Sequence, residues 1–281
     1  MEIKKAGKSG LCYGVKRAVA ILEKVCHERG MVETLGVEVH NRQLQQRLAE
    51  VGVRVARDLD DIRGDTVVIS AHGVSPQLEE EIRRRNYKVV DTTCPIVHRA
   101  QIAAHDLAKS GFLVVIYGDA EHPEVKGILG WADDKGVATT NSGFIAEMNP
   151  LPSHLGIVSQ TTQITANYNK FIQELAETHL PQDSELRTVD TICHYIKERQ
   201  ASAIELAKNV DLMVVIGGYN SANTNRLVEL CSTVTETYQV EMTDEIQSSW
   251  LSGKHSIGVA GGASTTDQTI DELVAKLKTM V

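Results

Sequence analysis

The sequence predicts an α/β fold in which three similar modules follow one another along the chain. Short apolar runs alternate with helical patterns, which is typical of largely parallel sheets. One arrangement of a cysteine, a polar loop and a strand occurs three times. The length of 281 residues is also above the usual size of a single compact core.

Apolar runs rich in Val and Ile are expected to form buried strands that stop at loops. They are Thr66–Ser70, Leu113–Tyr117, Leu155–Val158, Leu212–Ile216 and Ile257–Ala260. Between them, apolar residues recur at helical spacing in Val15–Cys26, in Ile96–Leu107 and in Arg199–Ala207. The alternation of the two patterns predicts crossover connections and therefore parallel strand pairs.

The composition places the chain in an ordinary globular class. Hydrophobic residues make up 42% and charged residues 23% of the sequence. No apolar run approaches the roughly 20 residues that cross a bilayer, and the first residues have no apolar core of secretory type, so we expect a cytoplasmic protein. The net charge of −8 argues against a general nucleic-acid binder. A small anionic substrate stays compatible with it, because a pocket can be locally positive.

The internal repeat centres on Cys12, Cys94 and Cys193, each of which opens a helical pattern. A residue in a polar loop lies 28 positions after each cysteine: His40, His122 and Ser221. A loop that follows a strand lies 60 to 71 positions after each cysteine and contributes His72, Thr161 and Ser264. The repeat predicts module boundaries at residues 1–93, 94–190 and 191–281.

The repeat has a geometric consequence. Loops at the carboxyl ends of parallel strands gather on one side of a sheet. Three such modules around a pseudo-threefold axis would bring the three cysteines to one point, surrounded by His, Thr, Ser and Asn.

Three convergent thiolates suit an iron–sulfur cluster in which one iron has no cysteine ligand. Buried core cysteines are the alternative, since free cysteines are often fully buried. A zinc site is less attractive because the chain lacks the CxxC spacing that structural zinc sites usually show. Cys26 and Cys231 fall outside the repeat and on apolar helical stripes, so we expect them in the core.

Several polar groups in the repeat could bind an anion or move a proton. The segments GGYNSAN (217–223) and GASTT (262–266) place small polar residues between a strand and a helix, which is typical of anion cradles but also of ordinary turns. Glu124 lies two residues from His122 and could deliver a proton. Alternatively, it is a solvated loop residue or pairs with Lys126.

The motifs together resemble the family of 4-hydroxy-3-methylbut-2-enyl diphosphate reductases. The matching segments cover residues 10 to 267: GLCYGVKRAV, VHNRQ, SAHGVSP, VDTTCP, EHPEVKGILG, SQTT, TIC with RQ at 199–200, GGYNSANTNRL and GGASTTD. The set is highly specific, although no single segment is.

The resemblance implies a trefoil of three pseudo-repeated α/β modules around a central [4Fe-4S] cluster, one per chain. It implies reductive dehydration of the diphosphate to isopentenyl and dimethylallyl diphosphates, with electrons from an external donor such as ferredoxin or flavodoxin. Cys12, Cys94 and Cys193 would hold the cluster. Glu124 would be the proton donor, helped by His122 and Thr161. The diphosphate would be bound by His40, His72, His122, Ser221, Asn223 and Ser264, and Thr161 would also contact the substrate.

The sequence departs from the family pattern at a few positions. Ala222 stands where a second serine is common, and His194, Tyr195 and Ile196 follow the third cysteine. A paralogue, or a non-redox iron–sulfur hydro-lyase, that acts on another small anion is therefore an alternative. A non-enzymatic iron–sulfur sensor is a third hypothesis, although it would have no need of Glu124 and the SQTT hydroxyls.

Overall fold

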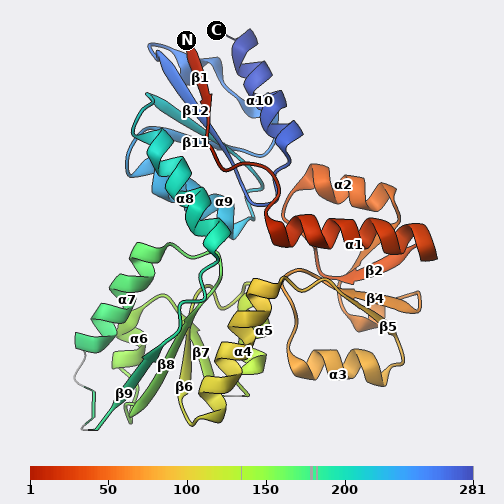
Figure 1. The fold of residues 1–281 in the computed structure, drawn as a ribbon, viewed down its shortest axis with the longest axis vertical. Helices are drawn as coiled ribbons and strands as arrows, with labels where there is room; N and C mark the ends of the chain where they lie inside the picture. Colours follow the sequence, from red (N-terminus) through yellow and green to blue (C-terminus); the bar gives the residue numbers. More distant parts are fainter. Residues whose placement is uncertain (134, 178–179, 182, 281) are drawn as a thin grey trace. The chain divides into compact units, whose positions relative to one another are not determined.

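The computed structural model describes residues 1–133, 135–177, 180–181 and 183–280. Within this part of the chain, the strands form three parallel sheets of four strands each, connected by helices (Figure 1). The α/β fold predicted from the sequence is confirmed.

The first sheet has the order β3-β2-β4-β5. Its strands are β2 (Val32–Leu35), β3 (Val53–Ala56), β4 (Thr66–Ile69) and β5 (Lys88–Asp91). The helices of this stretch are α1 (Tyr13–Arg29), α2 (Arg42–Glu50) and α3 (Pro76–Arg84). Ile82 of α3 packs in one core with Val67 and Ile69 of β4, so α3 covers one face of this sheet.

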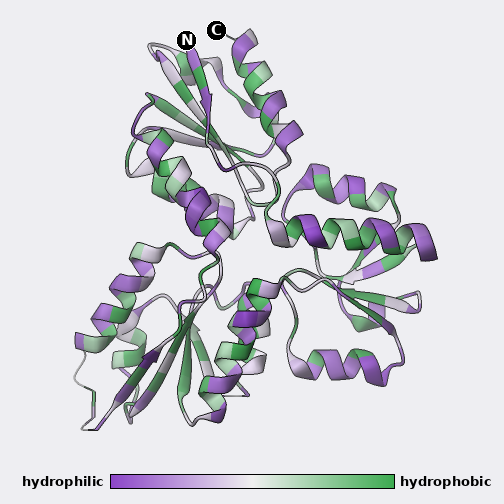
Figure 2. Cartoon of the chain, viewed as in Figure 1, coloured by the Kyte–Doolittle hydropathy of each residue, from purple (hydrophilic) through white to green (hydrophobic). Residues whose placement is uncertain are grey.

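The second sheet repeats this order as β7-β6-β8-β9. Its strands are β6 (Leu113–Tyr117), β7 (Gly136–Thr139), β8 (His154–Ser159) and β9 (Glu185–Thr188). Its helices are α4 (Pro95–Lys109), α5 (Pro123–Trp131), α6 (Ser142–Ala146) and α7 (Thr165–Glu177). Alternate residues of β6 face opposite cores: Val114 packs with α4 and α5, whereas Val115 packs with α6 and α7. The central strands are accordingly hydrophobic along their length (Figure 2).

The third sheet has the order β11-β10-β12-β1, and its fourth strand comes from the start of the chain. Its strands are β10 (Leu212–Ile216), β11 (Thr237–Val240), β12 (Ser256–Gly261) and β1 (Glu2–Lys5). Ile3 of β1 lies opposite Ile257 of β12 in parallel register. The helices are α8 (His194–Ala207), α9 (Ala222–Ser232) and α10 (Asp267–Thr279). Helices α8 and α9 pack on one face of this sheet and α10 on the other (Figure 1).

The three predicted helices and five predicted strands are confirmed within a few residues, except that α8 begins at His194 rather than Arg199. The remaining strands have only four residues each. Many of these lie at a sheet edge and are partly exposed, such as β9 with its single half-buried residue. Short, polar edge strands lack the apolar signal that marks a central strand.

The chain divides into two compact units. The first comprises Met1–Glu28, Val37–Val53 and His194–Val281, and the second comprises Arg29–Gly36 and Arg54–Cys193. The module boundaries at residues 93/94 and 190/191 stay a prediction.

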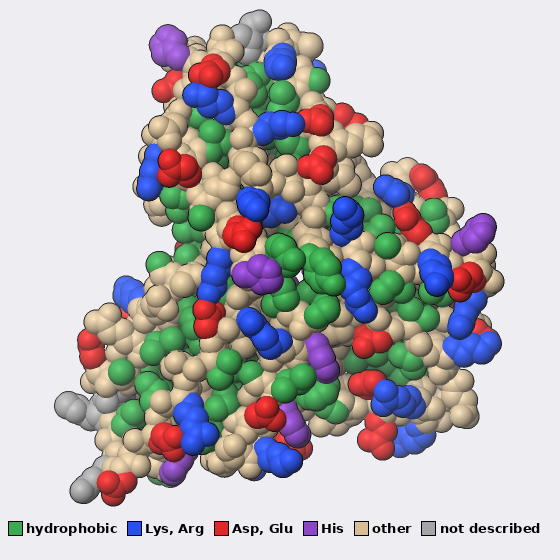
Figure 3. Space-filling model, viewed as in Figure 1, with side chains coloured by type: hydrophobic (Ala, Val, Ile, Leu, Met, Phe, Trp, Pro, Cys, Tyr) green, Lys and Arg blue, Asp and Glu red, His purple; other side chains and the backbone are tan. Residues whose placement is uncertain are grey.

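No described helix is long and apolar enough to cross a membrane. Figure 3 shows basic and acidic side chains scattered together over the visible face, without a large area of one sign.

Candidate active site

The candidate residues follow the two central strands of each sheet. In the third sheet, β10 leads to Ser221 and β12 leads to Ser264; in the second sheet, β6 leads to His122 and β8 leads to Thr161. In the second sheet, the chain turns to opposite sides from these two adjacent strands, since β6 continues to β7 and β8 continues to β9. Ligand sites of open α/β sheets lie at such a topological switch point, beyond the carboxyl ends of the strands.

Each repeat cysteine occupies the same place in its module. Cys12, Cys94 and Cys193 follow the fourth strand of their sheets and stand directly before α1, α4 and α8. In each case, the cysteine amide donates a hydrogen bond to a carbonyl in the loop after the third strand. The donor–acceptor distances are 2.8 Å from Cys12 to Ala263, 3.0 Å from Cys94 to Ala71 and 2.9 Å from Cys193 to Thr161. The threefold repeat is therefore a repeat of backbone structure as well as of sequence.

The three cysteines share a position at the amino end of a helix. Helices α1, α4 and α8 are described from end to end, and none has an acidic residue in its first turn. The positive end of a helix macrodipole stabilises a thiolate placed there. Cys12 and Cys94 are partly exposed, whereas Cys193 is buried.

The two other cysteines lie in apolar surroundings. Cys231 packs in the core under α8 and α9, and burial raises the pKa of its thiol to about 11. Cys26 is buried on the same face of α1 as Leu22. Both positions agree with the core role expected from the sequence.

In the second unit, Glu124 and Thr161 form one buried hydrogen-bond network. Glu124 lies in the first turn of α5 and is 2% exposed, so it is not a solvated loop residue. One carboxylate oxygen accepts from the Thr161 amide at 2.6 Å, and the other accepts from the Thr161 hydroxyl at 2.9 Å. The Thr161 carbonyl binds the Cys193 amide. Thr161 thus links the Glu124 carboxylate to the backbone of a candidate cluster ligand. Lys126, the alternative partner of Glu124, forms an ion pair with Glu121.

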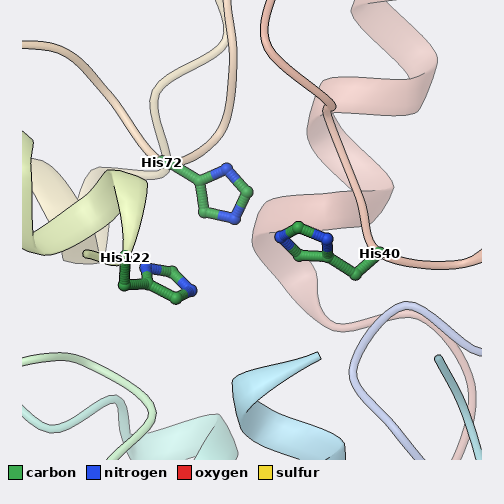
Figure 4. A group of neighbouring side chains, drawn as sticks. All are labelled: His40, His72 and His122. Carbon is green, nitrogen blue, oxygen red and sulfur yellow. The ribbon is translucent and has the colours of Figure 1, made fainter. Parts of the chain in front are cut away.

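His122 and His72 lie side by side in the same unit (Figure 4). Their ring centroids are 5.4 Å apart, and the rings are nearly perpendicular. His122 is the N-cap of α5, and its Nδ1 accepts from the Glu124 amide at 3.2 Å. An imidazole whose Nδ1 accepts a hydrogen bond carries its proton on Nε2 when neutral. His122 therefore presents an Nε2–H donor.

In the first unit, the GGYNSAN loop supplies Ser221 and Asn223. Ser221 is the N-cap of α9, and its hydroxyl accepts from the Thr224 amide at 3.3 Å. Asn223 is 5% exposed, and neither Oδ1 nor Nδ2 has a hydrogen-bond partner among the described residues. Buried amide groups are almost always hydrogen-bonded. The Asn223 side chain is thus ready for an external donor and acceptor.

His40 lies against this loop within the same unit. A Cβ atom on Gly218 would stand 2.1 Å from the His40 carbonyl oxygen, so only glycine permits the close approach of the two backbones. Asn41 then caps α2 by accepting from the Leu44 amide at 2.9 Å. Burial lowers the pKa of the half-buried His40.

The loop that carries Ser264 is tied to the end of β10. The Gly262 amide and the Thr265 hydroxyl both donate to the Ile216 carbonyl, each at 2.9 Å. Ser264 is 6% exposed. Ser221, Asn223, Ser264 and His40 therefore belong to one unit, whereas His72, His122, Glu124 and Thr161 belong to the other.

Arg199 and Gln160 have positions that the sequence alone did not single out. Arg199 is 5% exposed and donates to the carbonyls of Gly10 and Gly261 at 2.7 and 2.8 Å. Gln160 is fully buried beside Thr161, and its Oε1 accepts from the Asp119 amide at 3.3 Å. The RQ and SQTT segments were visible as motifs, but a motif does not say which of its members are buried.

The departures from the family pattern differ in exposure. Tyr195 is 40% exposed and stacks with Tyr13 at 5.8 Å between ring centroids, whereas Ile196 is buried at 3% exposure. Ala222 is the first residue of α9, between Ser221 and Asn223.

The sequence matches a family model described as LytB protein over residues 3–278. It is 50% identical over 277 residues to the 4-hydroxy-3-methylbut-2-enyl diphosphate reductase of Dehalococcoides mccartyi strain CBDB1, covering 99% of this chain and 98% of the relative. It is 40% identical over 279 residues to the protein of that name in Geobacter metallireducens, covering 99% and 97%.

Solved structures agree with this similarity. A structure of (E)-4-hydroxy-3-methyl-but-2-enyl diphosphate reductase, described as the terminal enzyme of the non-mevalonate pathway, aligns with a TM-score of 0.70 at 35% identity. That alignment covers 99% of this chain and all of the other. The reductase from Plasmodium falciparum aligns with a TM-score of 0.92 at 24% identity, covering 99% and 88%, which shows the shared fold.

Proposed function

We propose that this chain, which belongs to the LytB protein family, reduces 4-hydroxy-3-methylbut-2-enyl diphosphate to isopentenyl and dimethylallyl diphosphates. Its relatives with that name match it from end to end. The polar loops that follow two adjacent inner strands in each sheet support a binding site beyond the carboxyl ends of these strands.

The observation that carries the proposal is the link from Glu124 through Thr161 to Cys193. A buried carboxylate held by an amide and a hydroxyl is oriented for proton transfer. Its attachment to the loop of Cys193 supports a role as an acid close to a cluster ligand. A protein that only bound or sensed a cluster would need no such arrangement.

The three repeat cysteines fit a [4Fe-4S] cluster that lacks a fourth cysteine ligand. They share one backbone position, whereas Cys231 lies in an apolar core and Cys26 is buried on α1. Cys12, Cys94 and Cys193 would hold the cluster. When bound, the cluster would supply electrons and a Lewis-acidic iron for the substrate hydroxyl.

The reaction consumes two electrons and two protons. One proton leaves with the substrate hydroxyl as water, and the second adds to one of two allylic carbons, which accounts for two products. The Thr161 hydroxyl donates to the Glu124 carboxylate. Once protonated, Glu124 would donate in the reverse direction to the Thr161 oxygen, and Thr161 would pass its own hydroxyl proton to the substrate. The electrons would come from a carrier protein such as ferredoxin or flavodoxin.

The diphosphate would be bound by His40, His72, His122, Ser221, Asn223 and Ser264. The Nε2–H of His122 and the unpartnered amide of Asn223 can donate to phosphate oxygens. Binding far from the reacting carbon would fix the orientation of the substrate.

An anaerobic assay tests the proposal. Chain loaded with iron and sulfide is mixed with 4-hydroxy-3-methylbut-2-enyl diphosphate and dithionite-reduced methyl viologen, and products are separated by chromatography. We expect both diphosphate products. Turnover that persists without the reductant would instead identify a hydro-lyase, and no conversion of this substrate with reductant present would overturn the assignment.

A further inference from the structure

The guanidinium group of Arg199 joins two loops of the first unit. Arg199 lies on α8, and its Nη2 donates to the Gly10 carbonyl at 2.7 Å. Its Nη1 donates to the Gly261 carbonyl at 2.8 Å and more weakly to that of Gly262 at 3.4 Å. One planar group therefore binds both loops at the same time.

The two loops carry residues of the proposed site. Gly10 precedes Cys12 by two residues, and Gly261 and Gly262 precede Ser264. The Cys12 amide also donates to the Ala263 carbonyl at 2.8 Å, so the loops are bonded to one another next to Arg199. A shift of either loop would move both a cluster cysteine and a diphosphate-binding serine.

Gly10 needs this support because its backbone is constrained. Its φ angle is +75°, and a Cβ atom there would lie 2.5 Å from a carboxylate oxygen of Asp267. Ser9 donates to the same carboxylate at 3.0 Å. Asp267 and Arg199 thus hold the turn before Cys12, through the Ser9 hydroxyl and the Gly10 carbonyl respectively.

Among the described residues, no carboxylate accepts a hydrogen bond from Arg199. The acceptors of its two Nη atoms are neutral carbonyls, and its Nε has no partner in the described part of the chain, although the side chain is only 5% exposed. The Asp267 carboxylate interacts with the charge of Arg199. A buried cation requires compensation by nearby negative charge, and the cysteine ligands of a bound cluster would add to the charge of Asp267.

We propose that Arg199 is a positioning residue, which clamps the Cys12 loop to the Ser264 loop and places a permanent positive charge beside the cluster. This inference rests on the proposed function. The two effects of Arg199 can be separated by substitution. Binding both loops needs a planar guanidinium with several N–H donors, whereas the electrostatic effect needs only a positive charge.

The experiment compares Arg199→Lys with Arg199→Gln in cluster-loaded protein. The cluster potential is measured by spectroelectrochemical titration, the order of residues 8–13 and 261–266 by hydrogen exchange, and turnover by KM and kcat. Arg99→Gln is the matched control, since Arg99 is an exposed arginine on α4, the helix that follows Cys94.

We expect Arg199→Gln to shift the midpoint potential to more negative values, because the neutral side chain no longer stabilises the added electron. Arg199→Lys should keep a potential close to that of the unchanged protein. Both variants should exchange faster in the two loops, and both should raise KM by about tenfold or more through misplacement of Ser264. Arg99→Gln should change none of these quantities.

A wild-type potential in Arg199→Gln would overturn the electrostatic part, and wild-type exchange and KM in Arg199→Lys would overturn the clamp. If Arg199→Gln does not retain its cluster, the potential of Arg199→Lys decides the charge effect instead. A potential equal to that of the unchanged protein supports the effect, and a shifted potential contradicts it. If the unchanged protein fails to reduce the diphosphate, the proposed function fails, whereas exchange in the two loops still decides whether Arg199 is a clamp.

Discussion

The candidate groups of the two compact units differ in how far the protein itself satisfies them. In the second unit, both oxygens of Glu124 accept hydrogen bonds from Thr161, and Nδ1 of His122 accepts from an amide. In the first unit, both polar atoms of the buried Asn223 side chain lack partners among the described residues. Hydrogen bonds within the protein therefore orient Glu124 and His122, whereas the Asn223 side chain is open to hydrogen bonds from a ligand.

This difference predicts two kinetic signatures. Loss of an oriented acid should lower kcat, because the acid acts in the transition state. Loss of a group that only binds the diphosphate should raise KM with a smaller change in kcat, because its contact is equally strong in the ground state.

The largest effect should come from the three repeat cysteines. Changing Cys12, Cys94 or Cys193 to Ser should abolish both turnover and the brown colour of a protein that holds about four irons and four sulfides per chain. Iron and sulfide analysis with a visible spectrum provides the measurement. The control variants Cys26→Ala and Cys231→Ala should keep the colour; a colourless Cys26→Ala beside a coloured Cys94→Ser would refute the repeat.

Glu124→Gln should have the next largest effect. The amide keeps the shape of the side chain but cannot release a proton, so turnover should fall by at least about 10²-fold, while the cluster and substrate binding are kept. Single-turnover rates of the cluster-reduced protein provide the measurement. Glu121→Gln, an exposed neighbour that pairs with Lys126, should retain the full rate. A Glu124→Gln rate within threefold of the unchanged protein would make Thr161 or His122 the next candidate.

Asn223→Ala should raise KM by about tenfold or more, since a charge-assisted hydrogen bond contributes about 1.5–3 kcal/mol. Its kcat should change less than that of Glu124→Gln. Asn220→Ala tests the same loop at an exposed position and should be nearly silent. An unchanged KM with a low kcat in Asn223→Ala would contradict the prediction that Asn223 acts in binding and Glu124 in the chemical step.

His72→Asn tests whether the kinetic effect follows the role of a residue or its unit. His72 lies in the second unit with Glu124, but it is assigned to diphosphate binding like Asn223. We expect mainly a higher KM, by a smaller factor than for Asn223→Ala, since other groups share the contact. Competition by the free alcohol against the diphosphate is the second measurement. If the alcohol binds as tightly as the diphosphate, His72 does not belong to a diphosphate site.

The smallest effect should be that of Cys231→Ala. It removes one buried sulfur and should cost about 1 kcal/mol of unfolding free energy without change in KM or kcat. The pKa of about 11 also keeps this thiol protonated at neutral pH, so alkylation of the folded protein should spare Cys231. Denaturant unfolding and mass spectrometry check the two expectations; rapid labelling at pH 7 would contradict the core assignment.

The central strands could be predicted from the sequence because they are buried on both faces. Leu212–Ile216 is entirely apolar, and every residue of the strand is buried. Strand β2, although central, was not predicted, because its middle residues are Glu33 and Thr34, both buried. Burial acts to raise the pKa of Glu33, but hydrogen bonds from the Gly64 and Arg63 amides and from Arg54 lower it overall. A buried charge whose partners are 21 to 31 residues away leaves no local signal in the sequence.

The candidate site shows the same division. The sequence alone determined that three cysteines precede helices and that polar loops follow strands at repeated spacing, because these are local properties of the chain. Only the tertiary structure decided that Glu124 is buried on Thr161, that β1 completes the third sheet and that Arg199 joins two loops. It also decided that the Asn223 side chain has no hydrogen-bond partner within the described residues. Each of these depends on contacts between residues far apart in the chain, and periodicity carries no information about such contacts.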